Sequence, residues 1–286
     1  MALTFRRRDE AAPSPAVDAE SLAHLVHAMH QRGELAEVSR EHVEAILYAL
    51  RDSGHDVPAI DAAAYNEDFL TTIHNADFLR DPRFIAAYER GIEAVGGDYR
   101  FRWRVHVGLW AAATAIRLDG DFVECGVNRG FMSSAIMHYL DWNRRDRRFF
   151  LLDTFKGLDG DLLTEEERRL GKSSDYLGYT ECFAEVQANF AEFDNAILIR
   201  GSVPSTLPQA DTDAVAYLHI DMNCVAPEVA AIEHFWPRLL PGAIVLLDDY
   251  GSPGYEPQKD GMDGFAREHD LEILSLPTGQ GMLVKT

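Results

Sequence analysis

The sequence predicts an α/β protein: an N-terminal helical cap, then a doubly wound, mostly parallel sheet that ends in an antiparallel hairpin. Short apolar runs alternate with helical patterns from about residue 120 onward, and strand–helix alternation is typical of βαβ units. The final segment, LEILSLPTGQGMLVKT, has the pattern of two strands around a Pro-Thr-Gly-Gln-Gly turn. By contrast, the first part of the chain carries only the helical period.

The alternating region contains the predicted sheet. Its strands are expected at about 122–126, 148–153, 196–200, 214–221 and 243–248. The helices between them are expected at about 131–142, 180–192 and 226–239. The last helix has the clearest i, i+4, i+7 apolar stripe, and Pro227 suits its first turn.

The chain divides into three predicted parts. Residues 1–17, rich in charge, Ala, Pro and Ser, are expected to be a disordered leader. Residues 18–100 form the helical cap, and its helical stripes indicate no strand. Residues 101–286 contain the sheet, and the long polar stretch 157–178 within them is predicted to be a mobile loop over the site.

Composition restricts the possible partners. The chain has 27 basic and 47 acidic residues, a net charge of −20, which argues against nucleic acid and against a membrane surface. No apolar run reaches the roughly 20 residues that span a bilayer, and no apolar segment follows the basic N-terminal cluster as in a secretory signal. Three cysteines without metal-ligand spacing predict reduced thiols. We therefore expect a cytoplasmic protein that acts on a small molecule.

Residues that follow the predicted strands are the candidates for ligand binding, because open α/β sheets bind ligands beyond the carboxyl ends of their strands. Gly126 and Gly130 allow close approach of the backbone to a ligand. Glu124, inside the first strand, needs a cationic partner, which an amino-acid ammonium group would supply. Asp153 lies 23 residues beyond Gly130, an interval typical of an acid that binds a ribose diol, with a helix cap as the alternative. Ser202 follows the third strand, near the expected place of an adenine.

Three aspartates follow the fourth and fifth strands: Asp221, Asp248 and Asp249. Carboxylates at the ends of buried strands repel one another unless a cation lies between them. Oxygen ligands without His or Cys at ligand spacing suit Mg²⁺. The alternative is that one aspartate caps a helix and the others face solvent.

Four segments, GDFVECGVNRG, LLDTFKGL, YLHIDMN and PGAIVLLDDYG, occur in this order. In this combination the chain resembles the TylF/MycF/NovP family of metal-dependent O-methyltransferases over about residues 100–286. The resemblance implies a class I, Rossmann-like methyltransferase fold, S-adenosylmethionine as methyl donor, a bound Mg²⁺ and a sugar or glycosylated natural product as acceptor. By position it implies a cofactor site at Glu124, Gly126, Asp153 and Ser202. It also implies a metal site at the three aspartates.

One position departs from the family pattern. The family has Asp-x-Asp after the fourth strand, with the second acid as general base, whereas this chain has Asp221 followed two residues later by Asn223. An amide does not accept a catalytic proton, so Asn223 is expected to orient the substrate or to ligate the ion through its carbonyl. His219 is a candidate base, with a hydrogen-bonded core histidine as the alternative. Lys259 and Gln280 are expected to border the site.

These observations favour a Mg²⁺-dependent O-methyltransferase that acts on a sugar-like, hydroxylated small molecule and assembles as a homo-oligomer through its cap. A second hypothesis, prompted by Asn223, is a catalytically weak member that binds the cofactor or serves as an assembly subunit. A third, an NAD-linked oxidoreductase, is disfavoured by the missing middle glycine in GVNRG and by the terminal hairpin.

Overall fold

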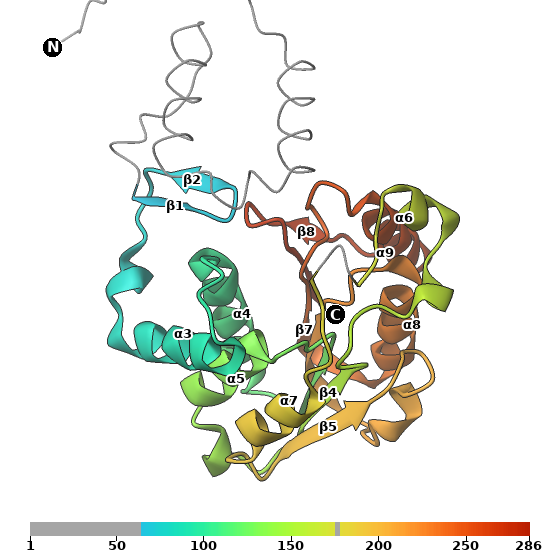
Figure 1. The fold of residues 1–286 in the computed structure, drawn as a ribbon. Coiled ribbons are helices and arrows are strands. Elements are labelled where there is room, and N and C mark those ends of the chain that lie inside the picture. Colours follow the sequence, from blue (N-terminus) through green and yellow to red (C-terminus); the bar gives the residue numbers. More distant parts are fainter. Residues whose placement is uncertain (1–63, 175–177) are drawn as a thin grey trace, which may run out of the picture. The chain divides into compact units, whose positions relative to one another are not determined.

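The computed structural model describes residues 64–174 and 178–286 (Figure 1). The expected leader at 1–17 and most of the expected cap lie outside these residues. A short sheet of two strands, β1 (Tyr65–Glu67) and β2 (Leu70–Thr72), begins the described part. The prediction that no strand interrupts the helical cap is therefore wrong at this place.

The main sheet has seven strands in the order β5-β4-β3-β6-β7-β9-β8. They are β3 (Asp121–Cys125), β4 (Phe149–Asp153), β5 (Ala196–Arg200), β6 (Val215–Ile220), β7 (Leu239–Leu247), β8 (Leu274–Ser275) and β9 (Gly281–Val284). The first five strands in this order pair in parallel, whereas β9 runs antiparallel to β7 and to β8. The predicted parallel sheet and terminal hairpin are confirmed, although β7 begins four residues before the expected start.

Helices cover both faces of this sheet (Figure 1). On one face lie α3 (Pro82–Val95), α4 (Arg102–Ala115), α5 (Phe131–Tyr139) and α7 (Phe183–Phe190). On the other lie α8 (Val225–Phe235) and α9 (Glu256–Glu268). Successive side chains of a strand point to opposite faces, so Phe122 belongs to the first core and its neighbour Val123 to the second. This two-sided burial explains why most residues of the parallel strands are apolar.

Aromatic rings form the centre of the first core. Phe122 lies with its ring centroid 5.0 Å from that of Trp142, 5.6 Å from Phe149 and 5.1 Å from Tyr217. All four side chains are completely buried. Rings at these separations add specific contacts to the area that they remove from water, so this cluster joins β3, β4 and β6 at the middle of the sheet.

The described part of the polar stretch 157–178 contains regular structure where a loop was predicted. It contains a 3₁₀ turn (Gly160–Leu162) and the short helix α6 (Glu165–Arg169). Thr164 and Glu167 form a capping box, and the fully buried Glu167 also accepts a hydrogen bond of 2.8 Å from the backbone of Val225. The prediction of a loop is therefore wrong over 160–169, because a capped helix is tied there to the start of α8.

The described part of the chain shows no break in packing at residue 100, since α3 packs against α5 in the same core as the sheet. The division into leader, cap and sheet domain stays a prediction. None of the described helices is both long enough and apolar enough to cross a membrane.

The aromatic cluster generates a stability prediction. Phe122→Ala should lower the free energy of unfolding by about 3–5 kcal/mol, because it leaves a cavity among rings that cannot collapse into it. Denaturant unfolding measures this change. Leu274→Ala, at a side chain that is 59% exposed, is the control and should change it by less than about 0.5 kcal/mol. Equal effects of the two substitutions would contradict a core role for the cluster.

Candidate active site

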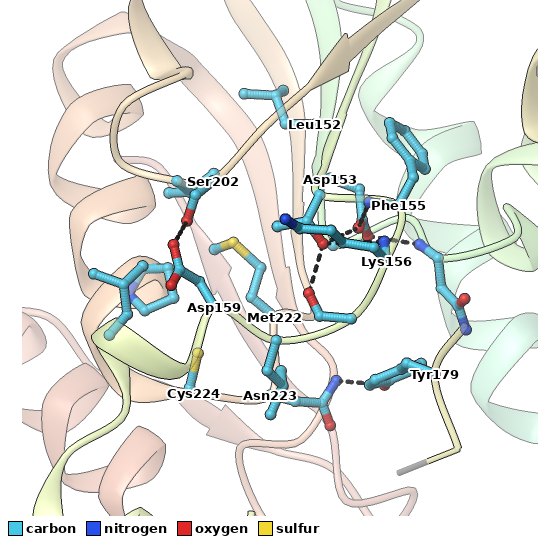
Figure 2. Close-up of a pocket in the computed structure, with 18 of the residues that line it drawn as sticks. Leu152, Asp153, Phe155, Lys156, Asp159, Tyr179, Ser202, Met222, Asn223 and Cys224 are labelled. Atoms are coloured by element: carbon cyan, nitrogen blue, oxygen red, sulfur yellow. Dashed lines mark hydrogen bonds between the residues drawn. The ribbon is translucent and has the colours of Figure 1, made fainter. Parts of the chain in front are cut away.

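A pocket opens at the carboxyl edge of the sheet, where the strand order reverses between β3 and β6 (Figure 2). Turns after four adjacent strands line it, together with Tyr179. Of the predicted site residues, it includes Gly126, Asp153, Ser202, Asp221 and Asn223. Open α/β sheets bind ligands at such a reversal, so the structure places half of the predicted site residues where a ligand is expected.

Asp153 organises the turn after β3 from the end of β4. One carboxylate oxygen accepts hydrogen bonds of 2.7 Å from the backbone N–H groups of Val127 and Asn128. The other oxygen accepts one of 2.6 Å from Phe155 (Figure 2). The Thr154 hydroxyl donates a fourth, longer bond of 3.4 Å. Since an ionised carboxylate offers about four acceptor sites, these bonds leave little capacity for a ribose diol.

The two predicted glycines have different roles. Gly126 has φ +92°, and a Cβ there would lie 1.8 Å from the carbonyl oxygen of Asp221. The ends of β3 and β6 therefore approach so closely that only glycine fits beside the pocket. Gly130 has φ +85° before α5, but a Cβ there would meet the ring of Phe190, so it serves helix packing outside the pocket lining.

Glu124 and His219 face each other on β3 and β6 and are both buried, outside the residues that line the pocket. Their Oε1 and Nδ1 atoms lie 2.8 Å apart. Burial alone would lower the pKa of His219, but Asp248 and Glu124 on either side outweigh it and raise the pKa to about 10. This geometry matches the alternative prediction, a hydrogen-bonded core histidine.

The three aspartates converge beside the pocket. Asp221 follows β6, Asp248 and Asp249 follow the neighbouring β7, and one carboxylate oxygen from each lies within 4.8 Å of the others. Burial, together with the charges of its two neighbours, raises the pKa of Asp221 well above its usual range. Burial and Asp248 raise the pKa of Asp249 to about 6. The cluster therefore resists three simultaneous negative charges unless positive charge is present.

Arg104 of α4 supplies one such charge. Its Nη1 atom lies 2.6 Å from Oδ2 of Asp248 and 3.3 Å from Oδ1 of Asp249. Although burial raises the pKa of Asp248, this guanidinium and His219 outweigh it and hold the pKa below its usual range. Sequence reasoning missed Arg104, because RFRWRVH (100–106) offers three arginines at alternate positions and no signal separates them.

Asn223, in the left-handed region at φ +61°, has a fully engaged amide. Its Nδ2 donates hydrogen bonds of 3.1 Å to Oδ1 of Asp221 and to the hydroxyl of Tyr179. Its Oδ1 accepts one of 2.8 Å from the hydroxyl of Tyr255. One of the two lone pairs of the carbonyl oxygen is therefore used by Tyr255, and ligation of an ion by this oxygen stays a prediction. No motif in the sequence marked either tyrosine.

Two further polar side chains, Lys172 and Gln280, contact Asn223 and the aspartates. Lys172, from the stretch predicted to be a loop, is buried and donates to the backbone carbonyl of Asn223 at 3.1 Å and to Gln258 at 3.0 Å. Gln280 borders the aspartates, as expected, and donates to Oδ1 of Asp248 at 3.1 Å. Lys259 pairs instead with Asp263 at 2.5 Å.

Ser202 lies on the far side of the pocket from Tyr179 (Figure 2). Its hydroxyl donates a hydrogen bond of 2.7 Å to Asp159, which links the turns after β5 and β4. Both residues line the pocket.

Comparison with known proteins decides the family. The family model for macrocin O-methyltransferase (TylF) matches residues 107–273, more than half of the chain. The chain belongs to the TylF family. The resemblance expected from its four sequence segments is thus confirmed, and these segments lie at the ends of β3, β4, β6 and β7.

Similar proteins in this family act on natural products. The chain is 29% identical to mycinamicin III 3''-O-methyltransferase of Micromonospora griseorubida, over 48% of the chain and 57% of that protein. It is 31% identical to 8-demethyl-8-(2,3-dimethoxy-alpha-L-rhamnosyl)-tetracenomycin-C 4'-O-methyltransferase of Streptomyces olivaceus, over 46% of the chain and 54% of that protein. The chain therefore spans little more than half the length of these relatives.

Two solved methyltransferase structures share the fold. The O-methyltransferase NovP matches with a TM-score of 0.57 and 24% identity over 64% of the chain and 79% of NovP. The calicheamicin methyltransferase CalS11 matches with a TM-score of 0.51 and 18% identity over 86% of the chain and 93% of CalS11. The class I methyltransferase fold expected from the sequence is confirmed.

The close approach at Gly126 generates a prediction. Gly126→Ala should lower the free energy of unfolding by more than about 2 kcal/mol, because the new methyl group collides with backbone at a positive φ. Denaturant unfolding measures the loss. Gly97→Ala, where a Cβ meets nothing within 4 Å, is the matched control. Similar free energies of unfolding for the two variants would contradict this prediction, because they would show that β3 and β6 can move apart without loss of stability.

Proposed function

We propose that this protein is a Mg²⁺-dependent O-methyltransferase that transfers the methyl group of S-adenosylmethionine to a hydroxyl of a sugar or glycosylated natural product. The observation that carries the proposal is the convergence of three aspartates, one buried and two half-buried, beside the pocket of a TylF-family chain. The O-methyltransferase activities of the relatives from Micromonospora griseorubida and Streptomyces olivaceus support a sugar-bearing acceptor.

The cofactor part of the proposal has S-adenosylmethionine in the pocket at the strand reversal, where it supplies the electrophilic methyl group. Gly126 would let backbone approach the cofactor, and the Asp153 carboxylate keeps the turn after β3 in shape. Ser202 and Asp159 close the opposite side of the pocket. In this proposal Glu124 and Gly130, which do not line the pocket, have no direct contact with the cofactor.

The metal part of the proposal rests on the donor set. Asp221, Asp248 and Asp249 offer only hard oxygen ligands, as Mg²⁺ prefers, and the Arg104 guanidinium already lies among them as a cation. When bound there, Mg²⁺ would supply positive charge that favours deprotonation of the acceptor hydroxyl.

The chain itself would orient the acceptor. The Tyr179 hydroxyl lines the pocket and accepts a hydrogen bond from Asn223, so its own proton remains available to an acceptor oxygen. Burial raises the pKa of Tyr179 far above its usual value, so the phenol stays neutral and acts as a donor. Correct alignment of the hydroxyl with the methyl group can lower the barrier by roughly 7–11 kcal/mol.

The proton would leave through the aspartates. Asn223 cannot accept it, and His219 lies behind the site against Glu124. Asp221 lines the pocket and is hydrogen-bonded to Asn223, so its carboxylate is the group to which we assign the proton of an acceptor held there. We assign His219 to the positioning of Asp248, whose Oδ1 lies 3.6 Å from Nε2.

A second candidate function is a cofactor-binding or assembly subunit with weak catalysis. The observation that favours it is the amide at the position of the family base, held by hydrogen bonds on both sides. Calorimetry separates the two functions: binding of S-adenosylhomocysteine without Mg²⁺ binding and without turnover on any hydroxyl supports the subunit.

The metal requirement is tested by methyl transfer from labelled S-adenosylmethionine to a panel of glycosides and nucleotide sugars. EDTA should stop turnover, and Asp248→Asn should lower kcat/KM by about 100-fold or more, because a metal ligand is lost. Asp211→Asn, at an exposed acid, is the control and should retain activity. Turnover that persists through both chelation and Asp248→Asn excludes the metal.

Asn223→Asp tests the missing base. The substitution removes the donor to Asp221 and Tyr179 and places a carboxylate against Asp221, so we expect kcat/KM to fall about tenfold or more. Asn195→Asp, at an exposed amide that donates one hydrogen bond, should have no such effect. Higher activity in Asn223→Asp would show instead that the enzyme lacks a base at this position.

A further inference from the structure

Arg104 lies between the aspartate cluster and a fourth acid, Asp68. Nη1 makes the contacts of 2.6 Å and 3.3 Å to Asp248 and Asp249, whereas Nε lies 3.1 Å and Nη2 3.5 Å from the two carboxylate oxygens of Asp68. Only 16% of the Arg104 side chain is exposed. The guanidinium is thus shared between two acidic partners on opposite sides.

Arg104 occupies an oxygen that an ion would need. Oδ1 of Asp248 already accepts from Gln280 at 3.1 Å and lies 3.6 Å from Nε2 of His219. Oδ2 of Asp248 accepts the short contact from Arg104. Both oxygens of this carboxylate are therefore engaged by the chain. Of these contacts, the one from Arg104 is made by a long, rotatable side chain that also contacts Asp68.

The charges around Arg104 also indicate that it competes with a cation. The three aspartates carry three negative charges when ionised, and Arg104 offsets one of them. A divalent cation a few ångströms from this guanidinium would be repelled by it, since two positive charges at such distances in a partly buried site interact strongly. When Arg104 moves away from Asp248, it can keep its ion pair with Asp68.

We propose that Arg104 is a built-in competitor of the divalent cation, which occupies Asp248 and Asp249 in the absence of metal and is drawn to Asp68 when metal binds. This inference rests on the proposed metal role of the aspartates. The affinity for Mg²⁺ would then depend on how strongly Arg104 is attracted to Asp248 and Asp249 relative to Asp68. Asp68, which is not among the residues that line the pocket, then determines how readily the site takes up its ion.

Two substitutions should change metal affinity in opposite directions. Arg104→Gln removes the competitor, so Mg²⁺ should bind about tenfold more tightly or better. Asp68→Asn removes the alternative partner, so Arg104 stays on the aspartates and Mg²⁺ should bind several-fold more weakly. A purely structural role of the Arg104–Asp68 pair predicts weaker binding in both variants.

The experiment is calorimetric titration of Mg²⁺ into the full chain saturated with S-adenosylhomocysteine, after binding of that compound has been measured by itself. Arg102→Gln is the matched control: it removes an arginine from the same helix that pairs with Glu67 and Asp98 at 2.6 Å, and the affinity should stay the same. Arg104→Lys, which keeps the charge, should remain close to the wild type.

Each outcome decides the inference. Tighter binding in Arg104→Gln with weaker binding in Asp68→Asn supports it, even if the wild type binds too weakly to measure. Unchanged or weaker binding in Arg104→Gln overturns it while leaving a chelation-sensitive methyl transfer intact. If Arg104→Gln does not fold, unchanged or tighter binding in Asp68→Asn overturns it. Absence of Mg²⁺ binding in wild type and Arg104→Gln alike, with the nucleoside still bound, overturns this inference and the proposed metal role together.

Discussion

The cost of burying carboxylates at one edge of the sheet is the constraint on which the site depends. Each buried acid there is compensated in a different way. Asp153 accepts backbone N–H groups, Glu124 faces His219, and Asp248 pairs with Arg104. A charge left without such a partner in a poorly solvated site would shift its pKa or destabilise the fold. The residues around the pocket are best understood as the set of partners that these acids require.

The parallel sheet explains why the acids meet. Strands β6 and β7 are neighbours in register, His219 opposite Leu246 and Ile220 opposite Leu247, so the residues that follow them emerge side by side. The reversal of strand order beside β6 leaves the adjacent crevice open for a ligand. Gly126 then allows the end of β3 to lie against the backbone of Asp221. The aspartate cluster and the pocket therefore both lie at the end of β6.

Part of this arrangement follows from local pattern. The five parallel strands, the terminal hairpin and the three aspartates were predictable, because apolar runs and strand-end acids are visible in the sequence at short range. The capped helix at 165–169 was missed because its polar residues hide the packing of Glu167. The strands at 65–67 and 70–72 were missed because three residues are too few to show a period. The sequence left His219 open between a base and a hydrogen-bonded core histidine, because the strand pairing that places Glu124 opposite it is not visible along the chain.

By itself, the sequence determined the fold class, the TylF-like segments and which carboxylates end the strands, since each depends on residue type and spacing along one element. Tertiary structure alone decided which side chains neutralise those carboxylates. Arg104 and Asp248 are separated by 144 residues, and Tyr179 and Asn223 by 44. Nothing local distinguishes Arg104 from Arg102 or Tyr179 from other tyrosines. Partner choice of this kind depends on how helices and loops pack over the sheet edge, and the pairing of opposite charges acts through space rather than along the chain.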